Sequence, residues 1–392
     1  MAPLGEITMI PALTRFHKFL RLSLLLLFGV VLSACQATMG TGPQVGQSVR
    51  VAMLLPYGSP NAGDDLLASS LENAARLAAA EAVGTQIELV VYPTQADAGT
   101  AAAVAQQAVA EGADVILGPL RSDAAAAVGV AVANTNVSVL SFSNNASIAG
   151  RNLFVLGLTY DNAAARMVSY AAANGRDRIM VVHARNLAGE VARDAVRRAA
   201  AASGATVVGE IAYEFSQTGV VAALPEVEAM VAQTGANAMI LTADASGALP
   251  LFGQLLPDNG FDTEATKIIG LTRWDIPAQT LEIRGLQGGW FVLPDPNAES
   301  AFRTRYQLAY QQAPHNLAPL AYDGMRAVID TVGRTGRLGG VDFASGSGFA
   351  GANGVFRLLP DGSIERGLAV VTLQDRQIIL VDPAPRTLGA GF

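Results

Sequence analysis

The chain has few of the residues on which disulfide frameworks, zinc sites and nucleic-acid interfaces depend. It contains one cysteine and three histidines in 392 residues, which excludes a disulfide framework and leaves too few soft ligands for a zinc site. Lysine occurs only at Lys18 and Lys267, and the net charge is −7, so binding to the phosphates of nucleic acid is not expected. Charged residues make up 15% of the chain and hydrophobic residues 51%, which predicts a folded protein.

Sequence motifs for catalysis are missing as well. The segment GSGFAG at 346–351 matches G-x-G-x-x-G by spacing alone, because a strand and not a helix is predicted after it. The sequence has no Walker A motif and no G-x-S-x-G elbow. His183 ends a predicted strand and His315 lies in a predicted loop. A structural role is expected for each of these histidines, so neither indicates catalysis. We therefore predict a non-enzymatic protein with no cofactor and no metal.

An export signal is predicted at the N-terminus. Three basic residues, the last of them Arg21, precede an apolar run at 22–32. This run is shorter than the roughly 20 residues that a membrane-spanning helix needs, so residues 1–34 are predicted to be a signal peptide. The sequence LSAC then ends at Cys35. It resembles a bacterial lipobox, and the resemblance implies that Cys35 is lipidated and becomes the first residue of the mature protein.

The segment after the cysteine bears on the location of the protein. Residues 35–48 are rich in Gly, Gln, Thr and Pro, which predicts a flexible tether between the membrane and a folded body. Gln36 stands where an Asp would resemble a retention signal for the inner membrane. We therefore expect a periplasm-facing lipoprotein that is anchored to the outer membrane through Cys35.

From Val49 onward, short apolar runs alternate with Ala-rich segments of helical period, as in parallel sheets that are covered by helices. The pattern occurs twice, which predicts a first lobe at 49–150 and a second lobe at 151–295. The fold class is therefore α/β, with two doubly wound parallel-sheet lobes joined by a hinge and a ligand site at the carboxyl ends of the strands. Residues 296–392 are predicted to form helices and antiparallel strands that complete mainly the first lobe.

Two segments resemble the type I periplasmic binding protein fold of the Leu/Ile/Val receptors. They are VILGPLRS at 115–122 and SFSNNA at 141–146. In those receptors, hydroxyl and backbone N–H groups at the corresponding places hold the carboxylate of the ligand. By position the resemblance implies Ser122, Ser143 and Asn145 in this chain. The alternative for Ser122 is that it only caps its helix.

The second half of the implied cleft departs from the receptor pattern. The receptors carry an acidic residue after a late strand, which pairs with the ammonium group of the ligand, whereas this chain carries Thr272 and Arg273. Because a buried ammonium group needs a partner, binding of a free amino acid requires a substitute, for which Asp244 is the candidate. Trp274 is predicted to be an accessible binding residue, and Trp290 a core residue. The candidate cleft residues of the second lobe are Arg185, Asp244, Arg273 and Trp274.

Other segments resemble the C-terminal domain of penicillin-binding protein activators. They are GPL at 118–120, FVLGL at 154–158, LQGGWFVLP at 286–294 and AYDG at 321–324. These activators are outer-membrane lipoproteins that bind a peptidoglycan synthase in the periplasm. The resemblance therefore implies a regulator of such a synthase, with a class A penicillin-binding protein as partner. The alternative is a receptor for an amino acid or small polar ligand that serves the permease of an ABC-type importer of the branched-chain type.

Overall fold

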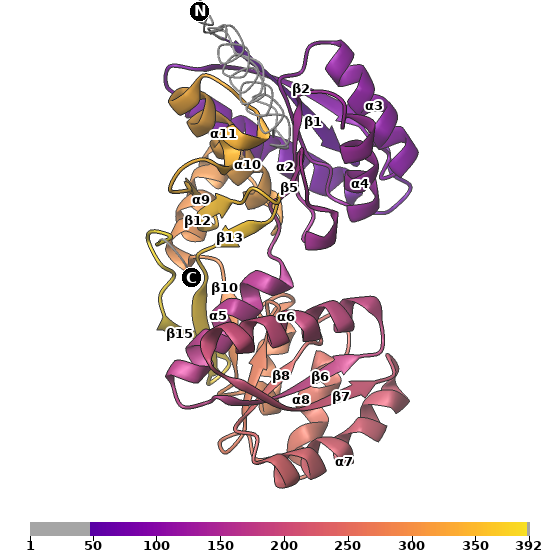
Figure 1. The fold of residues 1–392 in the computed structure, drawn as a ribbon, viewed down its shortest axis with the longest axis vertical. Helices are drawn as coiled ribbons and strands as arrows, with labels where there is room; N and C mark the ends of the chain where they lie inside the picture. The colour runs from indigo at the N-terminus through magenta and orange to yellow at the C-terminus, as the bar shows by residue number, and fades with distance from the viewer. Residues whose placement is uncertain (1–47, 390–392) are drawn as a thin grey trace, which may run out of the picture. The chain divides into compact units, whose positions relative to one another are not determined.

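The computed structural model describes residues 48–389, so the expected signal peptide, Cys35 and all but the last residue of the expected tether lie outside the described residues. Between 48 and 389, no helix is both long and apolar enough to cross a membrane. The described chain forms two α/β lobes, each with its own sheet, and a small third sheet (Figure 1). The predicted fold class is confirmed.

The sheet of the first lobe has five parallel strands in the order β2-β1-β3-β4-β5. Successive residues of β1 point to opposite faces of this sheet. Met53 joins a hydrophobic cluster with α2, and Leu54 joins a cluster with α3 and α4. The elements are β1 (Ser48–Leu55), α2 (Asp64–Ala80), β2 (Gln86–Pro93), α3 (Ala98–Ala110), β3 (Val115–Leu117), α4 (Ser122–Ala131), β4 (Ser138–Ser141) and β5 (Leu153–Val155).

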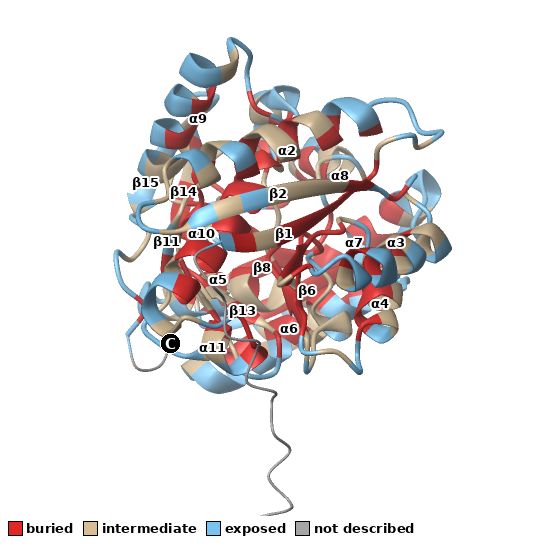
Figure 2. Ribbon diagram, turned by 90° about the horizontal axis from the view of Figure 1, so that it is seen from above, coloured by how far each residue is buried: buried red, intermediate tan, exposed pale blue. Residues whose placement is uncertain are grey.

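The sheet of the second lobe has the order β15-β14-β10-β9-β8-β6-β7. Within it, β10, β9, β8, β6 and β7 run parallel to one another. In contrast, β14 pairs antiparallel with β10, and β15 pairs antiparallel with β14. In β6, Met180 packs with α7 and α8 and Val181 with α5 and α6, so β6 is largely buried from both sides (Figure 2). The elements are α5 (Tyr160–Ala173), β6 (Arg178–Ala184), α6 (Leu187–Ser203), β7 (Thr206–Tyr213), α7 (Gln217–Thr234), β8 (Ala238–Leu241), α8 (Leu249–Asp258), β9 (Lys267–Gly270) and β10 (Trp290–Leu293).

The C-terminal segment divides between the two lobes. Phe302 of α9 and Met325 of α10 are buried in the first lobe, and β11, β12 and β13 form the small antiparallel sheet. The expectation that the last strands also return to the first lobe is wrong, because β14 and β15 extend the second sheet. The elements are α9 (Pro296–Tyr310), α10 (Ala318–Thr335), α11 (Gly340–Ala344), β11 (Phe349–Gly351), β12 (Gly354–Leu358), β13 (Ile364–Arg366), β14 (Ala369–Gln374) and β15 (Gln377–Asp382).

Burial on both faces explains the position of β14. Val370 joins one hydrophobic cluster of the second lobe and Val371 joins the other, so this strand needs a sheet that is covered from both sides. The boundary of the first lobe also differs from the prediction, because β5 (Leu153–Val155) pairs with β4. The first sheet therefore includes a strand beyond residue 150, where the sequence places the lobe boundary.

The chain passes between the lobes at 156–159, at 294–295 and at 367–368. A buried ion pair lies at these crossings: Arg366, at the end of β13, donates to Asp323 of α10 at 2.7 Å. The same guanidinium donates to the carbonyl oxygen of Leu156 at 3.1 Å. The ion pair therefore holds two of the crossing segments to α10.

Candidate binding cleft between the lobes

A cleft of about 740 Å³ lies where the carboxyl ends of strands from both sheets meet. This is the edge at which doubly wound sheets bind their ligands. Its first-lobe wall comes from the segments after β3 and β4 and from the start of α10, and its second-lobe wall from Tyr160 and the segments after β8 and β9. The residues that line it are Leu120, Arg121, Ser122, Asp123, Phe142, Ser143, Asn144, Gly157, Leu158, Tyr160, Asp244, Leu271, Thr272, Arg273, Leu317 and Leu320.

Ser122 lies at the start of α4 and lines the cleft. The N-cap position belongs to Arg121, whose side chain makes no cap bond, so Ser122 is not the cap residue. In the first turn, the Asp123 carboxylate accepts the N–H of Ala124 at 2.8 Å. Arg121 itself is paired with Asp64 at 2.8 Å. A hydrogen bond from Ser59, followed by the bond from Arg121, lowers the pKa of Asp64. The first turn of α4 therefore presents a hydroxyl and the positive end of a helix dipole to the cleft.

The two residues expected after β4 differ in position. Ser143 lines the cleft and is buried, and its hydroxyl oxygen accepts the N–H of Asn145 at 3.1 Å. Asn145 is not a lining residue, because its side-chain oxygen accepts the N–H of Ser147 and caps a short 3-10 helix at Ala146–Ile148. Asn144 lines the cleft instead. An Asn immediately before a short helix is itself a capping signal, and it was not recognised in the sequence.

Asp244 and Tyr160 stand on the second-lobe wall. The Asp244 carboxylate accepts the hydroxyl of Ser246 at 2.9 Å. Burial, and after it the charge of Asp244, raises the pKa of Tyr160, and the same causes raise the pKa of Tyr213 to about 12. The Tyr160 hydroxyl therefore stays protonated near a carboxylate. Tyr160 was not predicted as a cleft residue, although it follows FVLGL by two residues.

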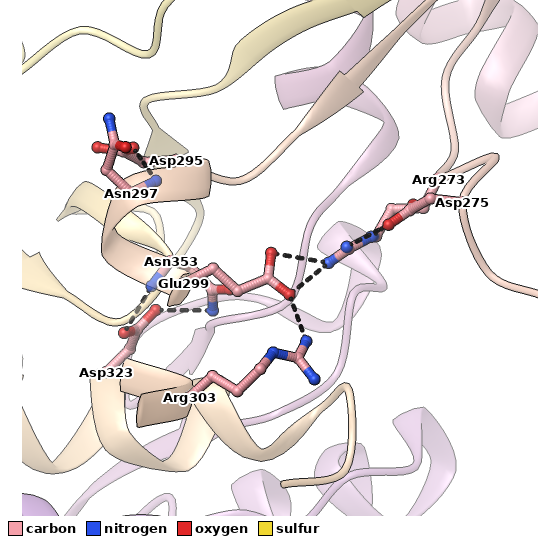
Figure 3. A network of polar contacts seen from close by, with 8 residues as sticks. All are labelled: Arg273, Asp275, Asp295, Asn297, Glu299, Arg303, Asp323 and Asn353. Carbon is pink, nitrogen blue, oxygen red and sulfur yellow. Dashed lines mark hydrogen bonds and ion pairs between the residues drawn. The ribbon is translucent and has the colours of Figure 1, made fainter. Parts of the chain in front are cut away.

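Thr272 and Arg273 follow β9 and line the same wall. The Thr272 hydroxyl is buried and has no hydrogen-bond partner in the described chain. The Arg273 guanidinium is fully engaged: it binds both oxygens of Asp275, at 2.9 and 2.6 Å, and Glu299 of α9 at 3.3 Å (Figure 3). Burial lowers the pKa of Arg273, but the bonds to Asp275 and Glu299 outweigh it and the pKa is raised. Arg273 is therefore neutralised by the protein itself.

Two predicted cleft residues lie elsewhere. Arg185 is exposed, pairs with Glu214 at 3.1 Å and does not line the cleft. The prediction that Trp274 is accessible is wrong, because its side chain is 0% exposed and stacks on Phe291 with ring centroids 5.1 Å apart. Of the seven cleft candidates, the structure brings four together in the cleft, which are Ser122, Ser143, Asp244 and Arg273.

The close approach of two glycines explains the burial of Trp274. A Cβ atom on Gly270 would lie 2.3 Å from the indole ring, and one on Gly289 would lie 2.7 Å from it. Glycine at both positions leaves room for the ring beneath the segment that follows β9. Trp290 is instead partly exposed, with Tyr170 against its ring and Lys267 over it.

Residues 48–377 match the family model described as periplasmic binding protein. The chain belongs to this family. The type I fold that the sequence resemblance implies is confirmed. Family membership implies a periplasmic location, and the family consists of solute-binding proteins, which are not enzymes. In residues 48–389, no group of three or more His, Cys, Asp or Glu side chains could hold a metal ion. No curated protein sequence matches the chain significantly.

Solved structures of solute-binding proteins are similar to this periplasmic binding protein. A branched-chain amino acid ABC transporter periplasmic ligand-binding protein from Burkholderia xenovorans LB400 has a TM-score of 0.68 at 17% identity, covering 86% of this chain and 96% of its own. A substrate-binding protein from Desulfitobacterium hafniense in complex with Leu has 0.63 at 17%, covering 85% and 100%. A solute-binding protein from Rhodopseudomonas palustris BisB5 in complex with 3,4-dihydroxybenzoic acid has 0.58 at 18%, covering 87% and 99%. At such low identity, these structural similarities establish the fold alone.

Proposed function

We propose that this periplasmic binding protein is the receptor of an ABC-type importer and binds a small carboxylate in the cleft between its lobes. The observation that carries the proposal is the start of α4, where the N-cap residue Arg121 makes no side-chain cap bond and Ser122 lines the cleft. The N–H groups and the dipole of a helix N-terminus stabilise an anion. The similar structures with bound Leu or 3,4-dihydroxybenzoic acid have ligands that share a carboxylate, which supports this choice.

Regulation of a peptidoglycan synthase is the other candidate, and the comparisons give it no support. The motifs that resemble the activators contain residues with packing roles. Gly289 of LQGGWFVLP makes room for Trp274, and Asp323 of AYDG belongs to the buried ion pair at the lobe crossings. Such residues serve the fold itself, so their presence does not distinguish a regulator from a receptor.

The carboxylate site predicts the behaviour of one substitution. Ser122→Ala should weaken binding of the solute by about 0.5 to 1.5 kcal/mol, because one hydrogen bond to the ligand is lost. The melting temperature should stay unchanged, since the Ser122 side chain does not cap α4. Calorimetric titration of a carboxylate that binds the unmodified protein measures the change.

Asn145→Ala is the matched control, because Asn145 belongs to the second segment that resembles the receptors but caps Ala146–Ile148 outside the cleft. It should leave the affinity unchanged and lower the stability slightly. Equal loss of affinity in both variants would contradict the assignment of the carboxylate site to α4.

We also propose that lipidated Cys35 anchors the protein to the outer membrane, with its folded region in the periplasm. Cys35→Ala should release the protein into the soluble fraction or leave it unprocessed, because the lipid supplies its membrane affinity. Fractionation of cells that express the variant measures this. A processed variant that remains in the membrane fraction would exclude the lipid anchor.

A further inference from the structure

The sheet of the second lobe ends in β15, and no strand of residues 48–389 pairs with its outer edge. β15 pairs with β14 on its inner side, and Figure 1 shows it at the margin of the second lobe. Three consecutive apolar side chains on this strand are exposed, Ile379 by 41%, Leu380 by 49% and Val381 by 39%. Because successive residues of a strand point to opposite faces, the edge is apolar on both faces of the sheet.

The outer edge of β15 lacks most of the features with which edge strands avoid association. Such strands are usually protected by a charged residue, a proline, a bulge or a covering segment. Residues 377–381 include no charged residue and no proline. The bulge of this strand lies at Val381, near its end, so that 377–380 remain regular. The backbone N–H and C=O groups along this stretch are therefore available to another strand.

The turn at 375–376 determines which of these backbone groups point outward. It joins β14 to β15 through two residues, both with positive φ, as in tight hairpins whose flanking residues bond to each other. Along an antiparallel pair, residues that bond to the partner strand alternate with residues that do not. The N–H and C=O groups of Gln377 and Ile379 therefore point toward β14, and those of Ile378 and Leu380 point outward.

We infer that the exposed apolar edge of β15 pairs antiparallel with β15 of a second copy of this chain, across a two-fold axis at Ile379. In this register, Ile378 of each copy lies opposite Leu380 of the other. These are the residues whose backbone groups point outward, so the pairing satisfies all of them. No residue of β15 lines the cleft, and the inference is therefore independent of the proposed receptor function.

Complementary charge supports both the second copy and this register. A two-fold axis at Ile379 places Arg376 of each copy opposite Asp382 of the other, and opposite charges across strands favour pairing. The Arg376 side chain is exposed. Asp382 accepts a bond from Arg166 at 2.6 Å, and its side chain is still 42% exposed. A two-fold pair forms each of these contacts twice, as in the closed dimers that are the commonest oligomers.

A cysteine on the two-fold axis tests the pairing in the full chain, because Cys35 is the only cysteine of the sequence. Ile379→Cys places two thiols opposite each other in a pair without backbone bonds, where the Cα atoms are about 4.5 Å apart. This distance permits a disulfide. Mild oxidation of intact cells that express the variant should convert most of it into a dimer on a non-reducing gel.

Leu380→Cys is the matched control, because this side chain points to the opposite face and lies across from Ile378. The two cysteines would be more than about 7 Å apart, too far for a disulfide. Leu380→Cys, Val83→Cys at a position of the first lobe that is 93% exposed, and the unmodified protein should all form little dimer. Absence of the dimer in Ile379→Cys, or equal dimer in all three cysteine variants, would overturn the inference.

Native mass spectrometry of the unmodified protein in mild detergent measures the pairing without a cross-link, and a mass of two chains is expected. Ile379→Lys places two like charges opposite each other on the axis, so it should weaken the dimer at least about tenfold. The melting temperature of this variant establishes that it is folded. A protein with the mass of one chain at every concentration, a dimer that is as stable in Ile379→Lys, or a complex with a different protein that this substitution removes would overturn the inference.

Discussion

Trp274→Ala is expected to lower the free energy of unfolding by about 3 to 5 kcal/mol, the cost of truncating a fully buried aromatic side chain. The Trp274 ring is 0% exposed, belongs to a hydrophobic cluster of the second lobe and stacks on Phe291. The cavity would not close easily, because Gly270 and Gly289 lie beside the ring and have no side chain to fill it. Urea denaturation, followed by circular dichroism, measures the loss.

Trp290→Ala is the matched control, since it removes the same side chain from a partly exposed position on β10. Trp290 contributes an edge contact with Tyr170 and a cation–π contact with Lys267. Its replacement should cost less, on the order of 1 to 2 kcal/mol. A larger loss for Trp290→Ala than for Trp274→Ala would contradict the packing described for this lobe.

Asp323→Asn is expected to destabilise the protein by about 3 to 5 kcal/mol, because it leaves a buried guanidinium without its counter-charge. The Asp323 side chain is 0% exposed and that of Arg366 is 2% exposed. Asp323 also accepts the N–H of Ala352 at 2.6 Å and the side-chain amide of Asn353 at 3.0 Å (Figure 3). The lost contacts would be those that hold the segments connecting the lobes to α10. Urea denaturation again measures it.

Asp330→Asn supplies the control for this ion pair. Asp330 lies on α10 as well and pairs with Arg326 one turn away, where both side chains are partly exposed. Such a pair contributes less than about 1 kcal/mol. In addition, the double variant Asp323→Asn with Arg366→Met should recover part of the stability, because the unpaired charge is removed. If the double variant is no more stable than Asp323→Asn, the cost does not come from an uncompensated Arg366.

The alternating pattern of apolar runs and Ala-rich segments was sufficient to predict the two doubly wound lobes. It was sufficient because central strands such as β3, β4 and β8 are covered on both faces and most helices on one, and both conditions leave a local pattern in the sequence. The destination of β14 was not predictable in this way. Its residues are apolar on both faces, which identifies a buried strand but not the sheet to which it belongs.

The cleft was predicted where residues lie shortly after the carboxyl ends of the strands, as Ser122, Ser143, Asp244 and Arg273 do. The errors arose from contacts between residues that are distant in sequence or from the direction of a side chain. Arg273 pairs with Asp275, which is close in sequence, but also with Glu299, 26 positions further along. The contact with Glu299 leaves no local signal in the sequence. Trp274 turns into the core because of Gly289, and loop composition carries no information on that direction.

Native mass spectrometry of the protein isolated from the cell envelope with a mild detergent tests the receptor function most directly. The receptor function predicts a folded chain that carries one small solute, of a size that fits a cleft of about 740 Å³. The Ser122→Ala variant should carry less of this solute. The proposed function predicts further that the released solute contains a carboxylate. A protein that carries no small molecule and is instead isolated in a stoichiometric complex with a penicillin-binding protein would contradict the receptor function.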